Sequence, residues 1–480
     1  MGNKRLIWVV FVSLMIVALV STSFAGQKTK IVVWTWSQEQ AQFFQEMEGR
    51  IEKKYPEIDV QFTTIVQAQY RNSLPLAFRG DNAPDIFFES NQPADLVSQG
   101  FARPLDEFMT PKFKNMFPAE YFYEGICKIN NKIYALPQSN YKIPRPIYLF
   151  YNKNVMKKAG LNPNRPPKTW SELRAMAKKI TQAGKGEYYG LAMVGKPAHD
   201  LNRVLTPLAS TLGLQENSNG DIDYRTGKWL ENDSRWVQLF EFVKSMKDDG
   251  SFFPGFASMD KTLARTYFAQ DKAAFYMDGL WLPGNLASMG YTNLNYGVAP
   301  PPVPDKGRQG YMYLTPNTTP MWYMSSQTKY PKEAWKVMSF MYSKEYQEKF
   351  VANNFGYSPL KNFNNAKYIQ DPILKEIIKM APSIARLGVM PSLRNPNAGK
   401  VKIVTTVNSI HPTMWEIMTA ALLGEADFKA EINALHTKVT AEFEKEIKEL
   451  QDSGVKISPD DFVFKNWDPM KDYTIDMYSK

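Results

Sequence analysis

The sequence predicts an α/β protein with a mostly parallel sheet, divided into more than one domain. Residues 30–36 form a run of β-branched and aromatic side chains, residues 40–55 carry apolar side chains at helical spacing, and residues 58–62 alternate like a half-buried strand. A strand, a helix and a strand in succession are typical of α/β domains. The chain has 480 residues, and this length favours two or three domains at roughly 150 residues each.

Two proline clusters mark places where the chain crosses between domains. Residues 86–88 are expected to form a short buried strand, and residues 142–146 carry two prolines just before the apolar run 147–151. A second proline cluster, residues 300–304, follows an expected strand at 294–298. Proline fixes φ and removes a backbone donor, so both clusters predict stiff, non-helical segments. Two such segments far apart in the chain indicate that it passes between lobes more than once.

Caps and periodicity predict two further helices. Thr169 or Ser171 is a suitable N-cap for a helix that continues to about residue 181. Apolar residues recur at spacings of three or four from Phe428 to Leu450, which predicts a long amphipathic helix with Glu and Lys on its other face. Coiled-coil pairing is an alternative, but we expect this helix to pack on its own lobe.

The tail after this helix is too aromatic for a disordered end. Residues 451–480 contain Phe462, Phe464, Trp467 and Tyr473. Chains that stay disordered have few aromatic residues, because they cannot bury enough apolar surface to offset the ordering entropy. We therefore expect the tail to pack back on the second lobe.

Composition indicates a globular protein and excludes several classes. Hydrophobic residues make up 44% of the chain and charged residues 22%, so the chain can bury large cores. The formal charge is +10, from 58 basic and 48 acidic residues, but the basic residues form neither a stripe nor an Arg-rich segment. Nucleic-acid binding is therefore not expected. The single cysteine, Cys127, excludes an intrachain disulfide and a cysteine metal cluster.

The N-terminal segment, residues 1–25, has the pattern of a signal peptide. Two basic residues precede an apolar run over residues 6–20, and Ser23 and Ala25 supply the small side chains that signal peptidase requires. The run is shorter than the roughly 20 residues that span a bilayer, which disfavours an uncleaved membrane anchor. No cysteine lies near the cut, so no lipid anchor is expected. The mature protein is expected to be soluble and periplasmic or otherwise extracytoplasmic.

We expect the mature protein to begin at Gly26 or within one residue of it. Only Ser23 and Ala25 provide paired small side chains after the apolar run. N-terminal sequencing of secreted material checks this expectation. An intact Met1 on membrane-bound protein would contradict it.

Catalytic and metal-binding motifs are not evident. The three histidines, His199, His411 and His436, are widely spaced and form no HExxH pair, so a zinc site is not expected. The sequence contains no GxSxG, P-loop or GxGxxG motif, and Cys127 is better explained as a small buried thiol than as a nucleophile. We expect no cofactor. Carboxylates are plentiful, so a glycosidase pair is not ruled out by counting.

Tryptophans in polar, turn-like settings are the most informative chemical feature. They are Trp34, Trp36, Trp281 and Trp415. A sugar ring has an apolar C–H face and a rim of hydroxyl groups, so an aromatic ring flanked by amides and carboxylates suits it. The alternative for each tryptophan is an ordinary place in the core.

Eight sequence segments, behind a signal peptide, carry a resemblance to a known family. They are IVVWTWS at 31–37, GDNAPDIFF at 80–88, NKIYALP at 131–137, YNK at 151–153 with KAGL at 158–161, PPKTWSEL at 166–173, FAQDKAAF at 268–275, DGLW at 278–281 and YPKEAW at 330–335. The chain resembles the extracellular solute-binding proteins of bacterial sugar ABC transporters, the group that includes maltodextrin-binding proteins. Each segment is weak alone, but together and in order they are specific.

The resemblance implies a two-lobed periplasmic-binding-protein fold with a multi-strand hinge and an interlobe ligand cleft. The N-terminal lobe is expected to hold residues 27–140 and 300–328. The C-terminal lobe is expected to hold residues 141–299 and 329–450, with residues 451–480 as an extension packed on it. Ligands of open α/β sheets bind beyond the carboxyl ends of strands.

The resemblance also implies a set of ligand contacts by position. They are Trp36, Ser37, Gln38 and Glu39 after the first strand; Glu89, Ser90, Asn91 and Gln92; Gln138 and Tyr141; and Trp281 and Trp415. Asp85 lies in a matching segment but is expected to be structural. No catalytic or metal-binding residue is implied. Residues 89 and 91 are at positions where relatives vary, so the identity of the sugar does not transfer.

The function implied is that of a non-catalytic receptor. It would capture a mono- or oligosaccharide by closure of the lobes and deliver it to the permease subunits of an ABC transporter, and we expect it to be a monomer. The alternative is a secreted carbohydrate-active enzyme with a Trp-lined cleft. Incubation with oligosaccharides separates the two hypotheses, because a receptor returns the sugar unchanged.

Overall fold

A computed structural model describes most of the chain. It describes residues 28–90, 93–140, 147–196, 198–214, 222–315, 320–363, 365–405 and 410–478. The expected signal peptide and the first proline-rich crossing, residues 142–146, lie outside the described residues. Among the described residues, no helix combines the length and apolar character needed to cross a bilayer.

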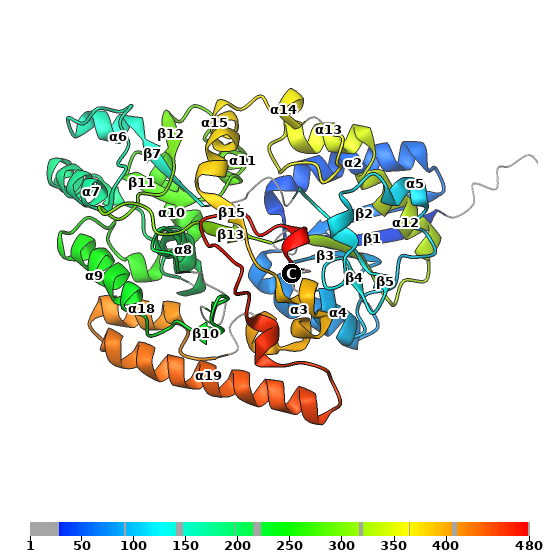
Figure 1. Cartoon of the computed structure of the whole chain (residues 1–480). Helices are drawn as coiled ribbons and strands as arrows, with labels where there is room; N and C mark the ends of the chain where they lie inside the picture. Colours follow the sequence, from blue (N-terminus) through cyan, green and yellow to red (C-terminus); the bar gives the residue numbers. More distant parts are fainter. Residues whose placement is uncertain are drawn as a thin grey trace, which may run out of the picture.

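The N-terminal lobe is built on a five-stranded sheet, on the right in Figure 1. Its strands are ordered β2-β1-β3-β14-β6. They are β1 (Thr29–Thr35), β2 (Ile58–Thr64), β3 (Ile86–Glu89), β6 (Ala135–Pro137) and β14 (Met321–Met324). Strand β1 pairs in parallel with β2 and β3, whereas β14 is antiparallel to β3 and β6. The expected opening of strand, helix and strand is confirmed.

The C-terminal lobe, on the left in Figure 1, is built on a four-stranded sheet. Its order is β12-β7-β11-β8. The strands are β7 (Tyr148–Asn152), β8 (Tyr189–Leu191), β11 (Ala273–Asp278) and β12 (Tyr296–Ala299). Strand β11 is parallel to β8 and antiparallel to β7, and β12 is also antiparallel to β7.

Strand direction brings one edge of each sheet toward the other lobe. Strands β1, β3 and β6 run the same way, because β14 is antiparallel to both β3 and β6. Their carboxyl ends therefore share one edge of the sheet. In the other lobe β8, β11 and β12 end at the edge where β7 begins. The two edges are neighbours, because α11 (Leu282–Ser288), which follows β11, contacts η1 (Gln38–Gln40), which follows β1.

Amphipathic helices cover the N-terminal sheet. Helix α2 (Ala41–Lys54) buries Phe43, Phe44, Met47 and Ile51 at helical spacing. The other helices of this lobe include α3 (Gln67–Arg79), α12 (Pro331–Met341) and α13 (Lys344–Ala352). Helix α12 contacts β1 and β14, and Tyr346 of α13 packs edge-on against Phe43 with ring centroids 5.0 Å apart.

This packing corrects the expected start of the second C-terminal segment. The expectation placed residues from 329 onward in the C-terminal lobe, but α12 packs on β1 and β14 of the N-terminal sheet and α13 packs on α2. The physical reason is that α12 follows β14 directly and buries Ala334, Val337, Met338 and Met341 beside it. The apolar stripe of α12 does not by itself select a sheet, and the helix packs on the sheet that contains the strand just before it.

The C-terminal lobe is also enclosed by helices. They include α7 (Trp170–Gly184), α9 (Ser234–Asp248), α10 (Lys261–Ala269), α18 (Met414–Leu423) and α19 (Phe428–Asp452). Thr169 caps α7, since its side chain accepts a hydrogen bond from the Glu172 N–H at 3.3 Å. Helix α19 packs its apolar face on its own lobe, as expected, and runs along the lower edge of that lobe in Figure 1.

A second correction concerns the second proline cluster. The expected N-terminal segment began at residue 300, but residues 302–309 lie on the C-terminal lobe. Trp170 donates its backbone N–H to Val303 O at 2.9 Å and its Nε1–H to Pro302 O at 3.1 Å. The chain then crosses between the lobes through β13 (Met312–Leu314), which pairs in parallel with β15 (Ala385–Leu387).

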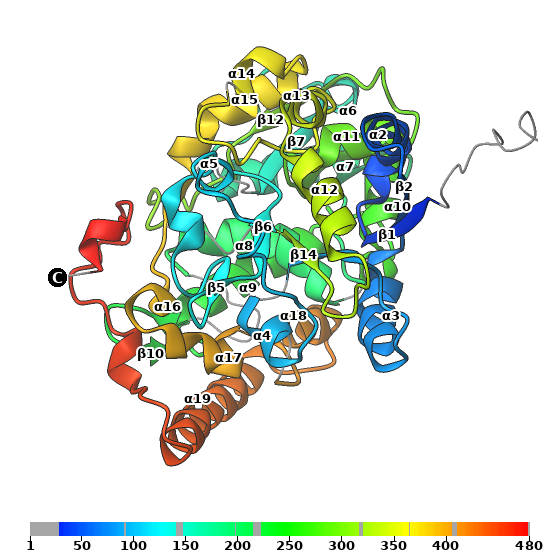
Figure 2. The ribbon, with the colours of Figure 1, turned by 90° about the vertical axis from the view of Figure 1, so that its right-hand side faces the viewer.

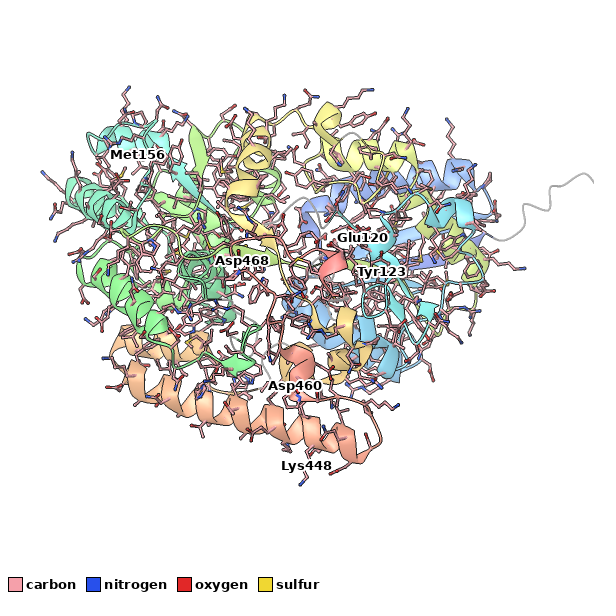
Figure 3. The ribbon with its side chains drawn as sticks, in the orientation of Figure 1. Glu120, Tyr123, Met156, Lys448, Asp460 and Asp468 are labelled. Carbon is pink, nitrogen blue, oxygen red and sulfur yellow. The ribbon has the colours of Figure 1, made fainter. Side chains whose placement is uncertain are left out.

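The extension after α19 packs first on the C-terminal lobe. Phe462 meets Phe443 of α19 edge-on with ring centroids 5.2 Å apart, and Phe464 donates its backbone N–H to Tyr224 O at 2.6 Å. Figure 3 shows Lys448 near the far end of α19, Asp460 on the first turn of the extension and Asp468 in the middle of the view, between the lobes. The extension therefore runs from the C-terminal lobe toward the hinge.

The extension then contacts β15, the partner of β13 at the crossing between the lobes. Tyr473 donates its backbone N–H to Leu387 O of β15 at 2.8 Å, and the Met390 N–H donates to the Tyr478 hydroxyl at 2.7 Å. The segment just after Met390 touches the N-terminal lobe, since a Cβ on Gly125 would lie 2.8 Å from Ser392 Cβ. Figure 2 shows the extension along one face of the molecule. It thus rests on segments that contact both lobes.

We expect the extension to resist proteolysis while the rest of the chain is folded. Phe464 is fully buried, and removing a buried phenylalanine side chain costs about 3 to 5 kcal/mol. Phe464→Ala should therefore release the extension, with faster cleavage after residue 452 in limited trypsin digestion followed by mass spectrometry. Met470→Ala is the matched control, because Met470 is 39% exposed. Rapid loss of the extension from the unmutated protein would contradict this expectation.

Candidate functional site

The side chain of Trp36 lies at the interlobe edge of the N-terminal sheet. It follows β1 directly and is partly exposed. Its ring packs edge-on against Tyr70 with centroids 5.3 Å apart and lies 4.7 Å from Phe88 at an angle of 39°. These two rings come from α3 and β3, so elements of the lobe's own core fix the orientation of Trp36.

The residues after Trp36 form a short 3-10 helix, η1 (Gln38–Gln40). Ser37 is buried and donates its backbone N–H to Thr35 Oγ1 at 3.2 Å, whereas Gln38 is exposed and Glu39 is partly exposed. Gln40 is buried and donates Nε2–H to Glu39 Oε1 at 3.3 Å. The buried Oε1 of Gln40 has no hydrogen-bond partner within the described part of the chain.

Glu89 ends β3 at the same edge and is buried, with 3% of its surface exposed. The Ser90 N–H donates to Glu89 Oε1 at 2.7 Å. Burial and the neighbouring Glu89 carboxylate raise the pKa of Tyr70 well above its usual value, so this phenol stays neutral and close to the carboxylate. The next two expected contacts, Asn91 and Gln92, lie outside the described residues.

Gln138 follows β6 and completes this side of the site. It donates its backbone N–H to Pro320 O at 3.0 Å, and it is buried, with 6% exposed. Its side-chain Nε2 has no hydrogen-bond partner among the described residues. An unpaired buried donor or acceptor costs about 1 to 3 kcal/mol. Gln138 Nε2 and Gln40 Oε1 are therefore suited to a polar partner other than the described residues. Tyr141 lies outside the described residues.

The opposite side of the site is formed by the turn after β11. Trp281 stands at the start of α11 (Leu282–Ser288) and is partly exposed. Its Nε1–H donates to Asp278 Oδ1 at 2.6 Å. Helix α11 contacts η1 of the N-terminal lobe, so the turn that carries Trp281 is next to the segment that follows Trp36.

Two polar interactions cross between the lobes beside this contact. Lys261 of α10 donates to Gln67 Oε1 of α3 at 3.2 Å. The Glu39 carboxylate of the N-terminal lobe also helps to raise the pKa of Arg265, which lies one helical turn after Lys261 on α10. The edges that carry Trp36 and Trp281 therefore face each other across a polar interlobe boundary.

Comparison with known proteins assigns a family to this two-lobed arrangement. The family model described as "Bacterial extracellular solute-binding protein" matches residues 35–348. The chain belongs to this family. Its expected membership is thereby confirmed, and the match begins at the end of β1 and ends within α13.

Three relatives illustrate how far this solute-binding protein resembles others. A protein of Brucella abortus (strain 2308) named as a binding protein is 29% identical over 382 residues, which cover 79% of this chain and 87% of the relative. The maltotriose-binding protein of Pyrococcus abyssi is 22% identical over 383 residues, which cover 78% of this chain and 75% of the relative. The structure of an ABC transporter solute-binding protein from Thermotoga lettingae, bound with α-D-tagatose, has a TM-score of 0.66 at 20% identity and covers 87% of this chain and 100% of its own. The predicted two-lobed fold is confirmed.

The position of Trp415 in this solute-binding protein corrects one expectation. We expected a partly solvated ring facing the cleft, but Trp415 is 2% exposed and belongs to the core of the C-terminal lobe. It packs edge-on against Trp236 with ring centroids 5.9 Å apart. The reason is that α18 is apolar on nearly every face, so its tryptophan is enclosed by α9.

Two other residues that the sequence singled out, Cys127 and Asp85, have structural roles. Cys127 is fully buried, and burial raises the pKa of its thiol, so an inert thiol is the correct interpretation. Asp85 accepts hydrogen bonds from the Val32 N–H at 2.9 Å and from the Thr328 hydroxyl, which joins β1 to the turn after β14. No group of three or more metal-ligating side chains is found among the described residues.

Several polar residues of the interlobe region were missed by sequence reasoning. Gln40 is one of them, and Tyr148 is another. Tyr148 begins β7 opposite Asp278, and its buried hydroxyl has no hydrogen-bond partner among the residues described. Asn354 is a third, because the Asn354 backbone O lies 3.9 Å from where a Cβ on Gly284 of α11 would be. A tyrosine at the start of an apolar strand has no sequence signal that separates it from a core tyrosine.

Proposed function

We propose that this solute-binding protein captures a mono- or oligosaccharide between its lobes and delivers it to the permease subunits of an ABC transporter. The observation that carries the proposal is the presence of Trp36 and Trp281 at facing edges of the two lobes, beside side-chain amide atoms of Gln40 and Gln138 that are buried and have no hydrogen-bond partner among the described residues. Aromatic faces suit the C–H surface of a sugar, and amides and carboxylates suit its hydroxyl groups.

The relatives support this choice of ligand class. One sequence relative is named for maltotriose, and one structural neighbour was determined with α-D-tagatose. The family consists of binding proteins, which favours a receptor over the alternative of a secreted carbohydrate-active enzyme. A monomer exported by a cleavable signal peptide, without a lipid anchor, fits this function.

The proposed contact set keeps most of the sequence-based candidates. It comprises Trp36, Ser37, Gln38, Glu39, Glu89, Ser90, Asn91, Gln92, Gln138, Tyr141 and Trp281, with Gln40 added for its unpartnered carbonyl. Trp415 is left out because its own lobe encloses it.

Binding would act on the equilibrium between open and closed lobes. A sugar that contacts both edges interacts better with the closed state, and it shifts the equilibrium by that difference in free energy. The permease would then distinguish loaded from empty receptor by the relative position of the lobes.

A thermal-shift screen against mono- and oligosaccharides tests the proposal. A sugar at a hundred times its dissociation constant should stabilise the protein by about 2.7 kcal/mol. Recovered sugar should be unchanged after prolonged incubation. Glycerol 3-phosphate and short peptides serve as controls for other ligand classes. Stabilisation by a control but by no sugar would contradict the proposal, and shorter sugar products would favour an enzyme.

A further inference from the structure

A closed set of hydrogen bonds surrounds Trp281. Asp278 accepts from the Trp281 Nε1–H at 2.6 Å through Oδ1 and from Arg265 Nε–H at 2.9 Å through Oδ2. Arg265 also donates Nη1–H to Asn285 Oδ1 at 2.9 Å. Asn285 in turn donates Nδ2–H to the Trp281 backbone O at 2.9 Å. The four residues thus form a ring of hydrogen bonds that begins and ends at Trp281.

The charges in this ring are buried and paired. Asp278 is fully buried and Arg265 is 7% exposed. Burial would lower the pKa of Arg265, but the Asp278 carboxylate, together with Tyr276 and Glu39, raises it above the ordinary value. Arg265 therefore stays charged, and hydrogen bonds donated by a charged group are the stronger kind. If either side chain turned away, the other would be left as an uncompensated buried charge, which is strongly destabilising. The pair therefore holds both side chains in place.

Glycine at 279 lets the indole lie flat on the turn. A Cβ at Gly279 would be 2.4 Å from Cη2 of Trp281, so no other residue fits beneath this ring. The Gly279 N–H also donates to Asp278 Oδ1, at 2.8 Å. One face of the indole is therefore covered by its own turn, and its only N–H is already used within the chain.

We propose that Arg265, Asp278 and Asn285 are positioning residues that hold Trp281 in one orientation, so that it meets a ligand with its ring face and not with its N–H. This inference rests on the proposed function for its effect on sugar binding. A side chain that is already ordered loses less freedom when a ligand binds, and this preorganisation increases affinity. The expected gain is about three- to tenfold for one rotamer-rich side chain.

Asn285→Ala tests the ring of hydrogen bonds without removing a charge. It deletes the Asn285 bonds to Arg265 and to the Trp281 backbone and leaves the pair of Arg265 and Asp278 in place. Ser288→Ala is the matched control, since Ser288 lies on the same helix and is exposed. If circular dichroism shows that Asn285→Ala is poorly folded, Arg265→Lys replaces it. Lysine keeps the positive charge beside Asp278 but lacks the Nη1–H that donates to Asn285.

The first measurement needs no sugar. In protein labelled with 5-fluorotryptophan, the ¹⁹F resonance missing from Trp281→Phe identifies Trp281. We expect that resonance to shift and change width in Asn285→Ala and to stay in place in Ser288→Ala. An unchanged resonance in Asn285→Ala would overturn the proposal, whatever the fate of the proposed function.

The second measurement is a double-mutant cycle with the sugar that gives the largest shift in the thermal screen. Asn285→Ala should weaken binding about three- to tenfold in the unmutated background. In the Trp281→Ala background the same change should have no further effect, because its action passes through Trp281. An equal loss in both backgrounds would mean that Asn285 contacts the sugar itself, and it would overturn the positioning role. If no sugar binds, the proposed function fails while the fluorine result stands.

Discussion

Replacing Trp281 by alanine is expected to weaken sugar binding by on the order of thirtyfold or more, which corresponds to at least about 2 kcal/mol. A stacked aromatic side chain at a buried contact is a typical hot spot of binding. The ring is partly exposed and packs at the margin of the core, so the free energy of unfolding of the apo protein should change less than it would for a fully buried tryptophan. Calorimetry with a cognate sugar, paired with the unfolding midpoint of the apo protein, measures both quantities.

The ring face and the N–H of Trp281 can be separated with Trp281→Phe. Phenylalanine cannot donate to Asp278, but it keeps an aromatic face. The Trp281→Phe variant should therefore bind the sugar more tightly than the Trp281→Ala variant. Normal sugar binding by Trp281→Ala, combined with much easier unfolding, would show that Trp281 is a core residue and that the site is misplaced.

Trp415→Ala should have the opposite profile. Trp415 is 2% exposed and packs against Trp236, and truncating a core tryptophan costs about 3 to 5 kcal/mol of stability through lost burial and the cavity left behind. Sugar affinity of the folded fraction should stay close to that of the unmutated protein. Urea unfolding at fixed pH, followed by calorimetry well below the midpoint, tests this prediction. Unfolding at the normal urea concentration together with lost sugar binding would contradict it and return Trp415 to the ligand site.

The contrast between Trp281 and Trp415 shows what sequence patterns can resolve. Both residues lie in short polar-looking segments, and neither neighbourhood reveals how many other elements enclose it. Trp281 lies in the turn that begins after Asp278, the last residue of β11, where the chain leaves the sheet at its edge. Trp415 stands on a helix that is apolar on most faces. Burial depends on which elements pack together, and that information is spread over the whole chain.

Local elements were predictable because their signals are local. The cap at Thr169, the strand at residues 86–88 and the apolar stripe of α19 all occur where periodicity and turn chemistry predict them. The lobe that a segment joins was less predictable. Helix α12 has an apolar stripe that would suit either sheet, and its place is set by the strand before it. Unpartnered polar atoms such as Gln138 Nε2 are likewise visible only once the lobes are assembled.

The position of β14 has a consequence for the order in which the lobes can fold. It lies between β3 and β6 in the N-terminal sheet, yet it begins at Met321, after all the strands of the C-terminal sheet. The C-terminal sheet is thus inserted, in the sequence, between two neighbouring strands of the other. Closing such a long loop has an entropic cost that grows with its length, and non-local strand pairing slows folding. During synthesis the N-terminal lobe therefore cannot complete its sheet until the chain that forms the second sheet has also been made.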